Sequence, residues 1–349
     1  MPIDIDPHAA SGPAAGQGFL GLDVAPAEAA VVLVPVPFAA TVSYGLGAHR
    51  GPAAILTASK QIDLFDLETG RPYAEGIAML PVPEQVLRWH DAARAYAARV
   101  IEAHDQPMAA DLQAVNEAGE RVNAWLAAQA EPWLAQGKLV GAVGGDHSTP
   151  FALIAACARR WPGLGVLHVD AHADLRRAYH GFTWSHASIF WNVLERCPGV
   201  ARLVGVAYRD LCEEERERCE DGSGRVRAFY DPWLKRRQEE GVPWVELCAE
   251  VVSHLPQQVY VSFDIDGLDP SLCPHTGTPV PGGLRWNEAT ALVRTVVESG
   301  RQIVGFDLCE VAPGPGDPGA SGSAADEWNQ NVGARLLYKL CGFALMSRR

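Results

Sequence analysis

The chain has 349 residues, and 48% of them are hydrophobic, so it can bury a sizeable core. Its 29 basic and 42 acidic residues give a formal charge of −13, which argues against nucleic acid as a partner and favours cationic ligands. The eight cysteines form no regular framework, and no stretch resembles a signal peptide or a membrane span. We therefore expect a cytoplasmic protein with reduced thiols and no membrane contact.

Short apolar runs alternate with longer helical patterns along the chain. Residues 1–19 are rich in Ala, Gly and Pro and are expected to form a flexible N-terminal arm. The runs that predict strands span residues 30–36, 138–145, 164–170, 201–207, 258–266 and 301–308. The patterns that predict helices span residues 91–104, 111–134 and 287–300, with Pro132 interrupting the second of them. The segment 211–240 is the most highly charged part, and we expect a solvated helix–loop–helix there.

This order of elements predicts the fold class. Buried strands that alternate with helices are typical of an α/β protein with three α-β-α layers around a mainly parallel central sheet. No repeat and no linker divides the chain, so we expect residues 20–349 to form a single domain.

Acidic and histidine residues gather at the ends of four predicted strands: Asp146 and His147; Asp170, His172 and Asp174; Asp264 and Asp266; Asp307 and Glu310. The carboxyl ends of parallel strands share one edge of a sheet, where ligands bind. In LHVDAHAD the last three polar residues stand at every second position, so an extended chain would point them in one direction. A single aspartate there is more often a helix cap, and a single histidine is more often satisfied by hydrogen bonds. So many carboxylates together, however, cannot all ionise in a buried site without cations.

The types of ligand favour divalent metal ions. Imidazole and carboxylate without thiolate suit Mn²⁺, Fe²⁺ or Ni²⁺. Six ligands are too many for one open catalytic ion, but they suit two ions that share bridging carboxylates. The sequence therefore predicts a binuclear metal centre at the carboxyl edge of the sheet.

The motifs GGDHS, DAHAD and SFDIDGLDP, in this order, resemble the three metal motifs of the ureohydrolases, the family of arginase and agmatinase. The resemblance covers roughly residues 30–345 and includes SYGLGAHRGPAAI at 43–55 and TGTPVPGG at 276–283. It implies that residues 20–349 form a catalytic domain with the arginase-like fold, which hydrolyses a guanidinium C–N bond. In this family a metal-bridging hydroxide attacks the guanidinium carbon and urea is released; two cations make that hydroxide available at neutral pH.

The resemblance also implies a role for each site residue. One metal ion, Mn²⁺ or Ni²⁺, would be held by His147, Asp170, Asp174 and Asp264, and the other by His172, Asp170, Asp264 and Asp266. Asp174 would also hydrogen-bond the hydroxide. Glu310 would pair with the guanidinium and Thr278 would steady it. His186 would carry protons to the leaving amine, with His180 as the second choice.

Departures from arginase bear on the substrate. Arg176 stands where arginases place an asparagine, and the spacing of GVAYRDLCEEE is altered, so arginine is not expected to be the substrate. The stretches RRAYHGFTWSHASIFWNVLE, CPHTGTPVPGG and DEWNQNVGARLLYKL resemble the nickel-dependent guanidine hydrolases, and metformin hydrolase, built from two ureohydrolase-type subunits, is a neighbour. We expect guanidine, or a small N-alkylated guanidine or biguanide such as metformin. Agmatine and 4-guanidinobutyrate are the alternatives.

Several bulky residues could line the pocket. Trp184, His275 and Trp328 are candidates for closing it around a small cation, and packing explains each of them equally well. Arg176 could hold the carboxylate of 4-guanidinobutyrate or simply pair with a local acidic residue.

Two interpretations from other classes stay open: a non-catalytic subunit of a mixed oligomer, and a single-zinc amide hydrolase. The presence of all six ligands argues against the first, and GGDHS and Glu310 argue against the second. The resemblance implies a trimer or hexamer of identical chains, or a hetero-oligomer with a related subunit.

Overall fold

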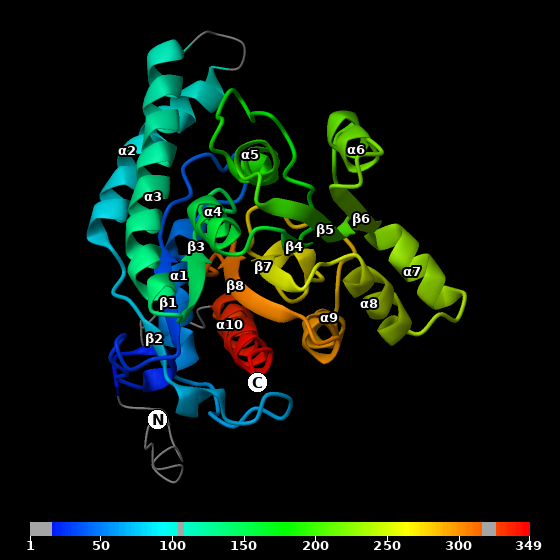
Figure 1. Ribbon diagram of the computed structural model, residues 1–349. Coiled ribbons are helices and arrows are strands. Elements are labelled where there is room, and N and C mark those ends of the chain that lie inside the picture. Colours follow the sequence, from blue (N-terminus) through cyan, green and yellow to red (C-terminus); the bar gives the residue numbers. More distant parts are fainter. Residues whose placement is uncertain (1–15, 104–107, 316–325) are drawn as a thin grey trace.

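Eight parallel strands form one sheet at the centre of the molecule (Figure 1). The computed structural model describes residues 16–103, 108–315 and 326–349. The strands are β1 Val31–Val36, β2 Ile77–Met79, β3 Leu139–Gly144, β4 Leu164–Val169, β5 Val200–Tyr208, β6 Val226–Tyr230, β7 Gln258–Asp264 and β8 Gln302–Cys309. Their order is β2-β1-β3-β8-β7-β4-β5-β6, and every neighbouring pair is parallel. The predicted parallel sheet is confirmed.

The last strand of the chain lies in the middle of the sheet. β8 pairs with β3 on one side and with β7 on the other, so it joins the group β2-β1-β3 to the group β7-β4-β5-β6. As a result, the carboxyl ends of β3, β8, β7 and β4 are neighbours although they come from distant parts of the chain.

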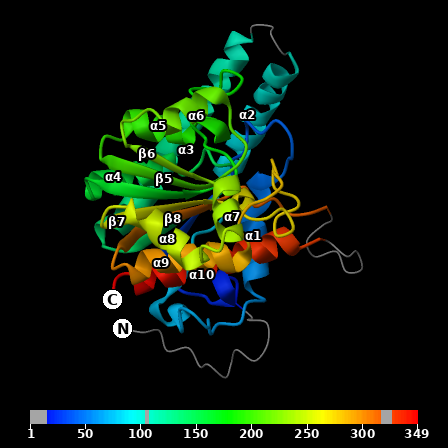
Figure 2. The ribbon, with the colours of Figure 1, turned by 90° about the vertical axis from the view of Figure 1, so that its right-hand side faces the viewer.

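Helices cover both faces of the sheet (Figure 2). One layer holds α2 Glu84–Glu102, α3 Ala109–Ala135, α4 Phe151–Arg160 and α5 Ile189–Arg196. The other holds α1 Gly51–Ser59, α8 Trp244–Ser253, α9 Trp286–Glu298 and α10 Trp328–Met346. Two further helices, α6 Glu213–Cys219 and α7 Asp231–Glu239, lie against β6. Short 3-10 helices span Phe19–Gly21, Ala48–Arg50, Pro72–Glu75, His186–Ser188 and Ile265–Gly267.

Alternate strand residues supply two hydrophobic cores, one on each face of the sheet. On β1, Val31 and Leu33 join the core shared with α1 and α10, whereas Val34 and Val36 join the core shared with α3 and α4. Burial on both faces explains why these strands are continuous apolar runs in the sequence. The predicted three-layer α-β-α architecture is therefore confirmed.

Some elements differ from the sequence prediction. The sequence patterns predict neither the three-residue β2 nor the edge strand β6. Segment 211–240, predicted to be a helix–loop–helix, contains α6, β6 and α7. Pro132 does not interrupt α3, because it lies in the last turn of that helix and the helix continues through it to Ala135.

Residues 1–15 of the predicted arm lie outside the described residues, and Phe19 at its end is buried in the core. Within the described ranges, no helix is both long enough and apolar enough to cross a membrane.

Candidate metal centre

The polar clusters meet at the carboxyl edge of the sheet. His147 follows β3, Asp170 follows β4, Asp264 ends β7 and Glu310 follows β8, on four neighbouring strands. The glycines of GGDHS allow close approach, since a Cβ on Gly145 would lie 2.1 Å from a carbonyl oxygen of the segment after β1. The edge predicted from the sequence is therefore where the candidate ligands lie.

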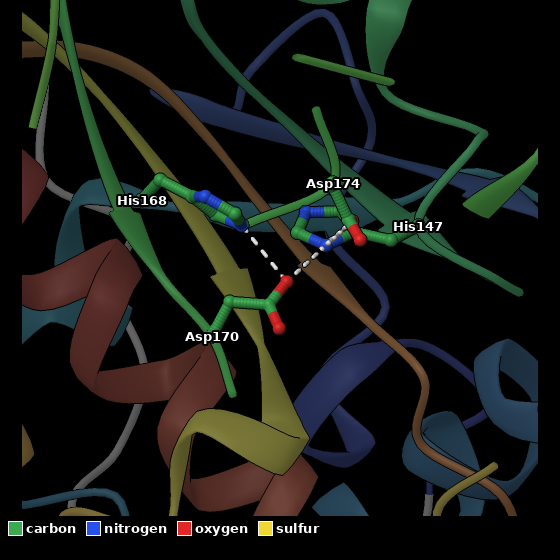
Figure 3. Close-up of side chains that lie close together, drawn as sticks. All are labelled: His147, His168, Asp170 and Asp174. Atoms are coloured by element: carbon green, nitrogen blue, oxygen red, sulfur yellow. Dashed lines mark hydrogen bonds and ion pairs between the residues drawn. The ribbon is translucent and has the colours of Figure 1, made fainter. Parts of the chain in front are cut away.

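His147 faces three carboxylates, of which Figure 3 shows those of Asp170 and Asp174. Its Nδ1 atom lies 3.0 Å from Asp170 Oδ2, and 3.3 Å from both Asp174 Oδ2 and Asp264 Oδ2. These four residues are the set that the family resemblance assigns to one metal ion.

His172 lies beside the second predicted set. Its Nδ1 atom is 3.1 Å from Asp266 Oδ2 and 3.4 Å from Asp170 Oδ1. Asp264 is linked to this set because its Oδ1 atom accepts the backbone N–H of Asp266 at 2.8 Å. Asp170 presents Oδ2 to His147 and Oδ1 to His172, which is the position a bridging ligand requires.

The chain leaves the strand before it reaches the ligands of DAHAD. β4 ends at Val169, and Asp174 has a φ of 54°, a left-handed conformation that costs roughly 1–2 kcal/mol in a residue with a Cβ. The chain therefore does not stay extended through DAHAD, and the alternation of these residues does not determine where they point. A loop gathers them, held by the N–H of His172 donating to Asp170 Oδ1 at 2.6 Å.

Burial and mutual repulsion control the ionisation of the carboxyl groups. Burial, followed by the charge of Asp170, raises the pKa of Asp174 to about 7. Burial, followed by the charge of Asp266, raises the pKa of Asp264 well above its usual value. For His147 burial acts to lower the pKa, but hydrogen bonds to the three carboxylates raise it well above its usual value.

The contacts behind His147 show that the donor set fits a metal ion. Ser262 Oγ donates to Asp307 Oδ2 at 2.9 Å, so toward His147 Nε2, also 2.9 Å away, it acts as an acceptor. A neutral imidazole that donates from Nε2 carries its lone pair on Nδ1, toward the three carboxylates. A lone pair and several anionic oxygens directed at one place suit a divalent cation.

Glu310 lies beside this cluster with one oxygen unpaired. It is 5% exposed and has a φ of 61°. Its Oε1 atom accepts the N–H of His147 at 3.1 Å, whereas Oε2 has no hydrogen-bond partner among the described residues. Burial, followed by the charges of Asp146 and Asp266, raises the pKa of Glu310 well above its usual value. A buried carboxylate oxygen without a donor is a receptor for a cation that carries N–H groups.

The loop after β7 lines the same space. Thr278 Oγ1 donates to Asp266 Oδ2 at 3.3 Å, and a Cβ on Gly277 would lie 3.3 Å from Glu310 Oε2. Arg209 holds this loop, because its Nη2 atom donates to the carbonyl oxygen of Asp266 at 2.6 Å. The adjacent residues Gly277 and Thr278 therefore lie beside Glu310 and the predicted ligand Asp266, respectively.

The two candidate proton carriers lie in different surroundings. His186 Nδ1 is 3.1 Å from Thr41 Oγ1, and burial, followed by the charge of His172, lowers the pKa of His186 to about 3. His180 is exposed, with its ring 4.5 Å from that of Tyr179, and no described contact joins it to a predicted ligand. The structure thus brings His186 toward the cluster and leaves His180 at the surface.

Arg176 pairs with a local acidic residue. Its Nε atom is 3.3 Å from Glu215 Oε2, and Glu215 is 2% exposed. Glu215 also accepts the backbone N–H groups of Leu175 at 3.1 Å and Cys212 at 3.0 Å. These contacts match the predicted pairing of Arg176 with a local acidic residue, and they do not match a free cation at the mouth of the site.

The three candidates for closing the pocket have contacts of their own. Trp184 is 7% exposed and packs against Phe151, with ring centroids 4.8 Å apart. His275 Nε2 is 2.7 Å from Asp326 Oδ2, and Trp328 is 46% exposed. In the described part of the chain no contact joins the three to the metal ligands, and their role in closing the pocket stays a prediction.

Three side chains around the site were missed by sequence reasoning. His168 lies 2.8 Å from Asp170 Oδ2 through its Nε2 atom, and its signal was present, since it extends the alternation of LHVDAHAD one step back. Ser262 and Thr41 carry no comparable signal, because a single serine inside a strand or a single threonine in the loop after one is common in any protein.

Sequence comparison shows what the chain resembles. The model of the Arginase family matches residues 29–340. The N(1)-aminopropylagmatine ureohydrolase of Synechocystis sp. is 31% identical over 324 residues, which cover 93% of this chain and 92% of that protein. The protein of the same name from Thermus thermophilus is 34% identical over 287 residues, which cover 82% of this chain and 84% of that protein.

Solved structures show the same fold. The proclavaminate amidino hydrolase from Streptomyces clavuligerus matches with a TM-score of 0.68 at 23% identity, covering 97% of this chain and 100% of that chain. The arginase from Bacillus caldovelox matches with a TM-score of 0.64 at 22% identity, covering 89% of this chain and 98% of that chain. The predicted arginase-like fold is therefore confirmed.

Proposed function

Because the chain belongs to the arginase family, it is a hydrolase of guanidino C–N bonds, and we propose that its substrate is a guanidinium cation without a carboxylate group. The observation that carries this proposal is the buried Oε2 atom of Glu310, which lacks a partner among the described residues. A guanidinium offers only N–H donors and is the complement of such an oxygen. Guanidine, or a small N-alkylated guanidine or biguanide such as metformin, is the first candidate, because of the stretches that resemble guanidine hydrolases.

A second candidate rests on the names of the relatives. Proteins 31% and 34% identical to this chain are named N(1)-aminopropylagmatine ureohydrolases, so that compound and agmatine are the alternative substrates. Both lack a carboxylate, as guanidine does. The pairing of Arg176 with Glu215 supports this shared feature, because Arg176 is then not available to hold a carboxylate such as that of 4-guanidinobutyrate.

The residues fit a centre of two divalent ions, Mn²⁺ or Ni²⁺, held by His147, His172, Asp170, Asp174, Asp264 and Asp266. When bound, the ions would lower the pKa of water so that hydroxide is available at neutral pH. Glu310 holds the guanidinium through charge-assisted hydrogen bonds, and Thr278 steadies it. Water adds to the guanidinium carbon, one C–N bond breaks, and the products are urea and an amine or ammonia.

His186 exchanges a proton with the leaving group. Its Nδ1 atom is occupied by the hydroxyl of Thr41, so Nε2 is the atom that exchanges a proton with the departing nitrogen. Burial lowers the pKa of His186 to about 3, which makes the neutral ring a weak base but makes its protonated form a strong acid toward the departing nitrogen.

The test of the receptor is Glu310→Gln, which keeps the shape of the side chain but places an amide N–H where the guanidinium donates. We expect urea release to fall by about 10² or more, while the metal content stays that of the wild type. Glu215→Gln changes another buried glutamate, one with no described contact to a metal ligand, and should change urea release much less. Equal loss in both variants would contradict the role of Glu310.

The test of the substrate is a panel of guanidine, metformin, agmatine, N(1)-aminopropylagmatine, 4-guanidinobutyrate and arginine with protein loaded with Mn²⁺ or Ni²⁺. Guanidine should have the highest kcat/KM. A preference for arginine or 4-guanidinobutyrate would contradict a carboxylate-free substrate. Absence of urea from every compound, with two ions bound, would favour the non-catalytic subunit.

We further propose that the chain assembles as a trimer or hexamer of identical copies. Light scattering of the purified protein measures the mass, and a stable monomer that releases urea would contradict this assembly. A hetero-oligomer would show as activity that needs a second, related chain.

A further inference from the structure

A buried histidine lies behind the predicted metal centre and contacts its central carboxylate. His168 on β4 is fully buried, with its ring centroid 4.0 Å from that of Phe190 and 5.3 Å from that of Tyr208. Its Nε2 atom is 2.8 Å from Asp170 Oδ2 (Figure 3), and its Nδ1 atom is 2.6 Å from the hydroxyl of Tyr208. Because both ring nitrogens are occupied by protein groups, His168 has no nitrogen left for an ion.

The partners fix the direction of both hydrogen bonds. An ionised Asp170 only accepts, so His168 donates from Nε2. Nδ1 of the neutral ring then carries the lone pair and accepts from the O–H of Tyr208. The result is a chain from Tyr208 through His168 to the carboxylate that faces both His147 and His172.

β5 is distorted in a way that turns Tyr208 toward His168. Residues two apart in a regular strand share a face, yet Val204 and Val206 belong to one core and Tyr208 belongs to the opposite one. The register against β6 shifts between Val206 and Tyr208, and Ala207 has a φ of 76°. This irregularity is a β-bulge, a device that redirects a side chain.

A glycine inside β5 makes room for the ring of Tyr208. A Cβ on Gly205 would lie 2.1 Å from Tyr208 Cζ, so any larger residue at that position would displace the tyrosine. A left-handed alanine and a glycine inside a strand are both unfavourable. Both are required by the placement of one tyrosine whose hydroxyl contacts His168.

We propose that Tyr208 and His168 are positioning residues that fix the orientation of Asp170 and thereby set the affinity of the centre for its metal ions. Partners that hydrogen-bond to metal ligands typically change metal affinity or activity 10–100-fold. Since Asp170 is the predicted bridging ligand, loss of the chain weakens the binding of both ions. The inference rests on the metal centre of the proposed function, but it does not depend on which guanidino compound is the substrate.

The test measures Mn²⁺ affinity of the whole chain by competition with a chelator, together with metal content after dialysis. Tyr208→Phe removes only the hydroxyl and should weaken Mn²⁺ binding about tenfold. Tyr338→Phe is the matched control, because it removes another buried hydroxyl, which donates to the carbonyl oxygen of Leu64 at 2.5 Å in the core shared with α10. His168→Gln keeps an amide N–H for Asp170 and should retain more affinity than His168→Leu.

Other results with these variants would overturn the proposal. Wild-type affinity in Tyr208→Phe would show that the hydroxyl does not orient Asp170, and equal weakening in Tyr338→Phe would show that the effect is general loosening of the core. Loss of one ion in His168→Gln but not in Tyr208→Phe would make His168 a ligand. Wild-type protein that binds Mn²⁺ but releases no urea would count against the proposed function alone, whereas wild-type protein that binds no Mn²⁺ would overturn both.

Discussion

Two histidines follow the second metal motif, and their surroundings predict different effects of substitution. His186→Ala should lower kcat by about 10²–10⁴ and leave the metal content unchanged, because its ring contacts Thr41 and none of the predicted ligands. His180→Ala, at the exposed neighbouring position, is the control and should leave kcat near that of the wild type. Steady-state kinetics with metal analysis distinguish the two, and the reverse pattern would show that His180 carries the proton.

The ion pair of Arg176 with Glu215 predicts that Arg176 contributes little to guanidine hydrolysis. Its side chain is 38% exposed, and partly exposed pairs contribute at most about 1 kcal/mol. Arg176→Ala should therefore change guanidine hydrolysis by less than about fivefold. The measurement is kcat/KM for guanidine and for 4-guanidinobutyrate. A strong wild-type preference for 4-guanidinobutyrate that disappears in Arg176→Ala would contradict the small-cation assignment.

At the level of single residues, the sequence predicts which side chains gather but not how the backbone presents them. The spacing of DAHAD and the ends of the strands identify Asp170, His172 and Asp174, because parallel strands place their carboxyl ends together. The left-handed φ of Asp174 and of Glu310 depends on contacts made by other strands, so no local pattern reveals it. The hydrogen-bond partners of these residues come from distant segments for the same reason.

Segment 41–46, which follows β1, links the loops around the site. Thr41 contacts His186, and Ser43 Oγ is 3.1 Å from the hydroxyl of Tyr179. The backbone N–H of Gly45 donates to the carbonyl oxygen of Gly277 at 2.9 Å. This segment therefore connects the loop that carries His186 to the loop that carries Thr278.

Gly45→Ala tests this connection. A Cβ at this position would lie 2.8 Å from the carbonyl oxygen of Gly277, so the two loops must move apart. Since Gly277 lies beside Glu310, we expect KM for guanidine to rise about tenfold or more, with metal content retained. Ser43→Ala removes only an exposed hydrogen bond and should change KM much less. Unchanged KM in Gly45→Ala would mean that the loop contact does not shape the receptor.

Among the elements, strands buried on both faces were the most predictable. Six of the eight were visible as apolar runs, because burial on both faces requires apolar residues throughout. β6 lies at the edge of the sheet, has five residues and stands within a charged segment, and β2 has three residues, too few for a pattern. Their place depends on pairing with β5 and β1, which no local pattern encodes.

Metal binding should stabilise the whole molecule, because it supplies the positive charge that buried carboxylates lack. Mn²⁺ at 100 times its Kd would contribute about 2.7 kcal/mol to the free energy of unfolding, so the Tm should rise by several degrees and fall again with a chelator. Asp264→Asn should lose bound metal, urea release and this rise in Tm together. Asp269, a few residues on in the same motif, accepts the backbone N–H of Ser271, and the control Asp269→Asn should behave as the wild type. A metal-dependent rise in Tm in Asp264→Asn would contradict the bridging role of Asp264.

The central position of β8 has a consequence for the newly synthesised chain. As the protein leaves the ribosome from its N-terminus, the groups β2-β1-β3 and β7-β4-β5-β6 cannot join until residues 302–309 have emerged. His147 belongs to the first group, whereas His172, Asp170, Asp264 and Asp266 all belong to the second. The ligands of one predicted ion can therefore come together earlier than those of the other, and the centre can receive both ions only when translation is nearly complete.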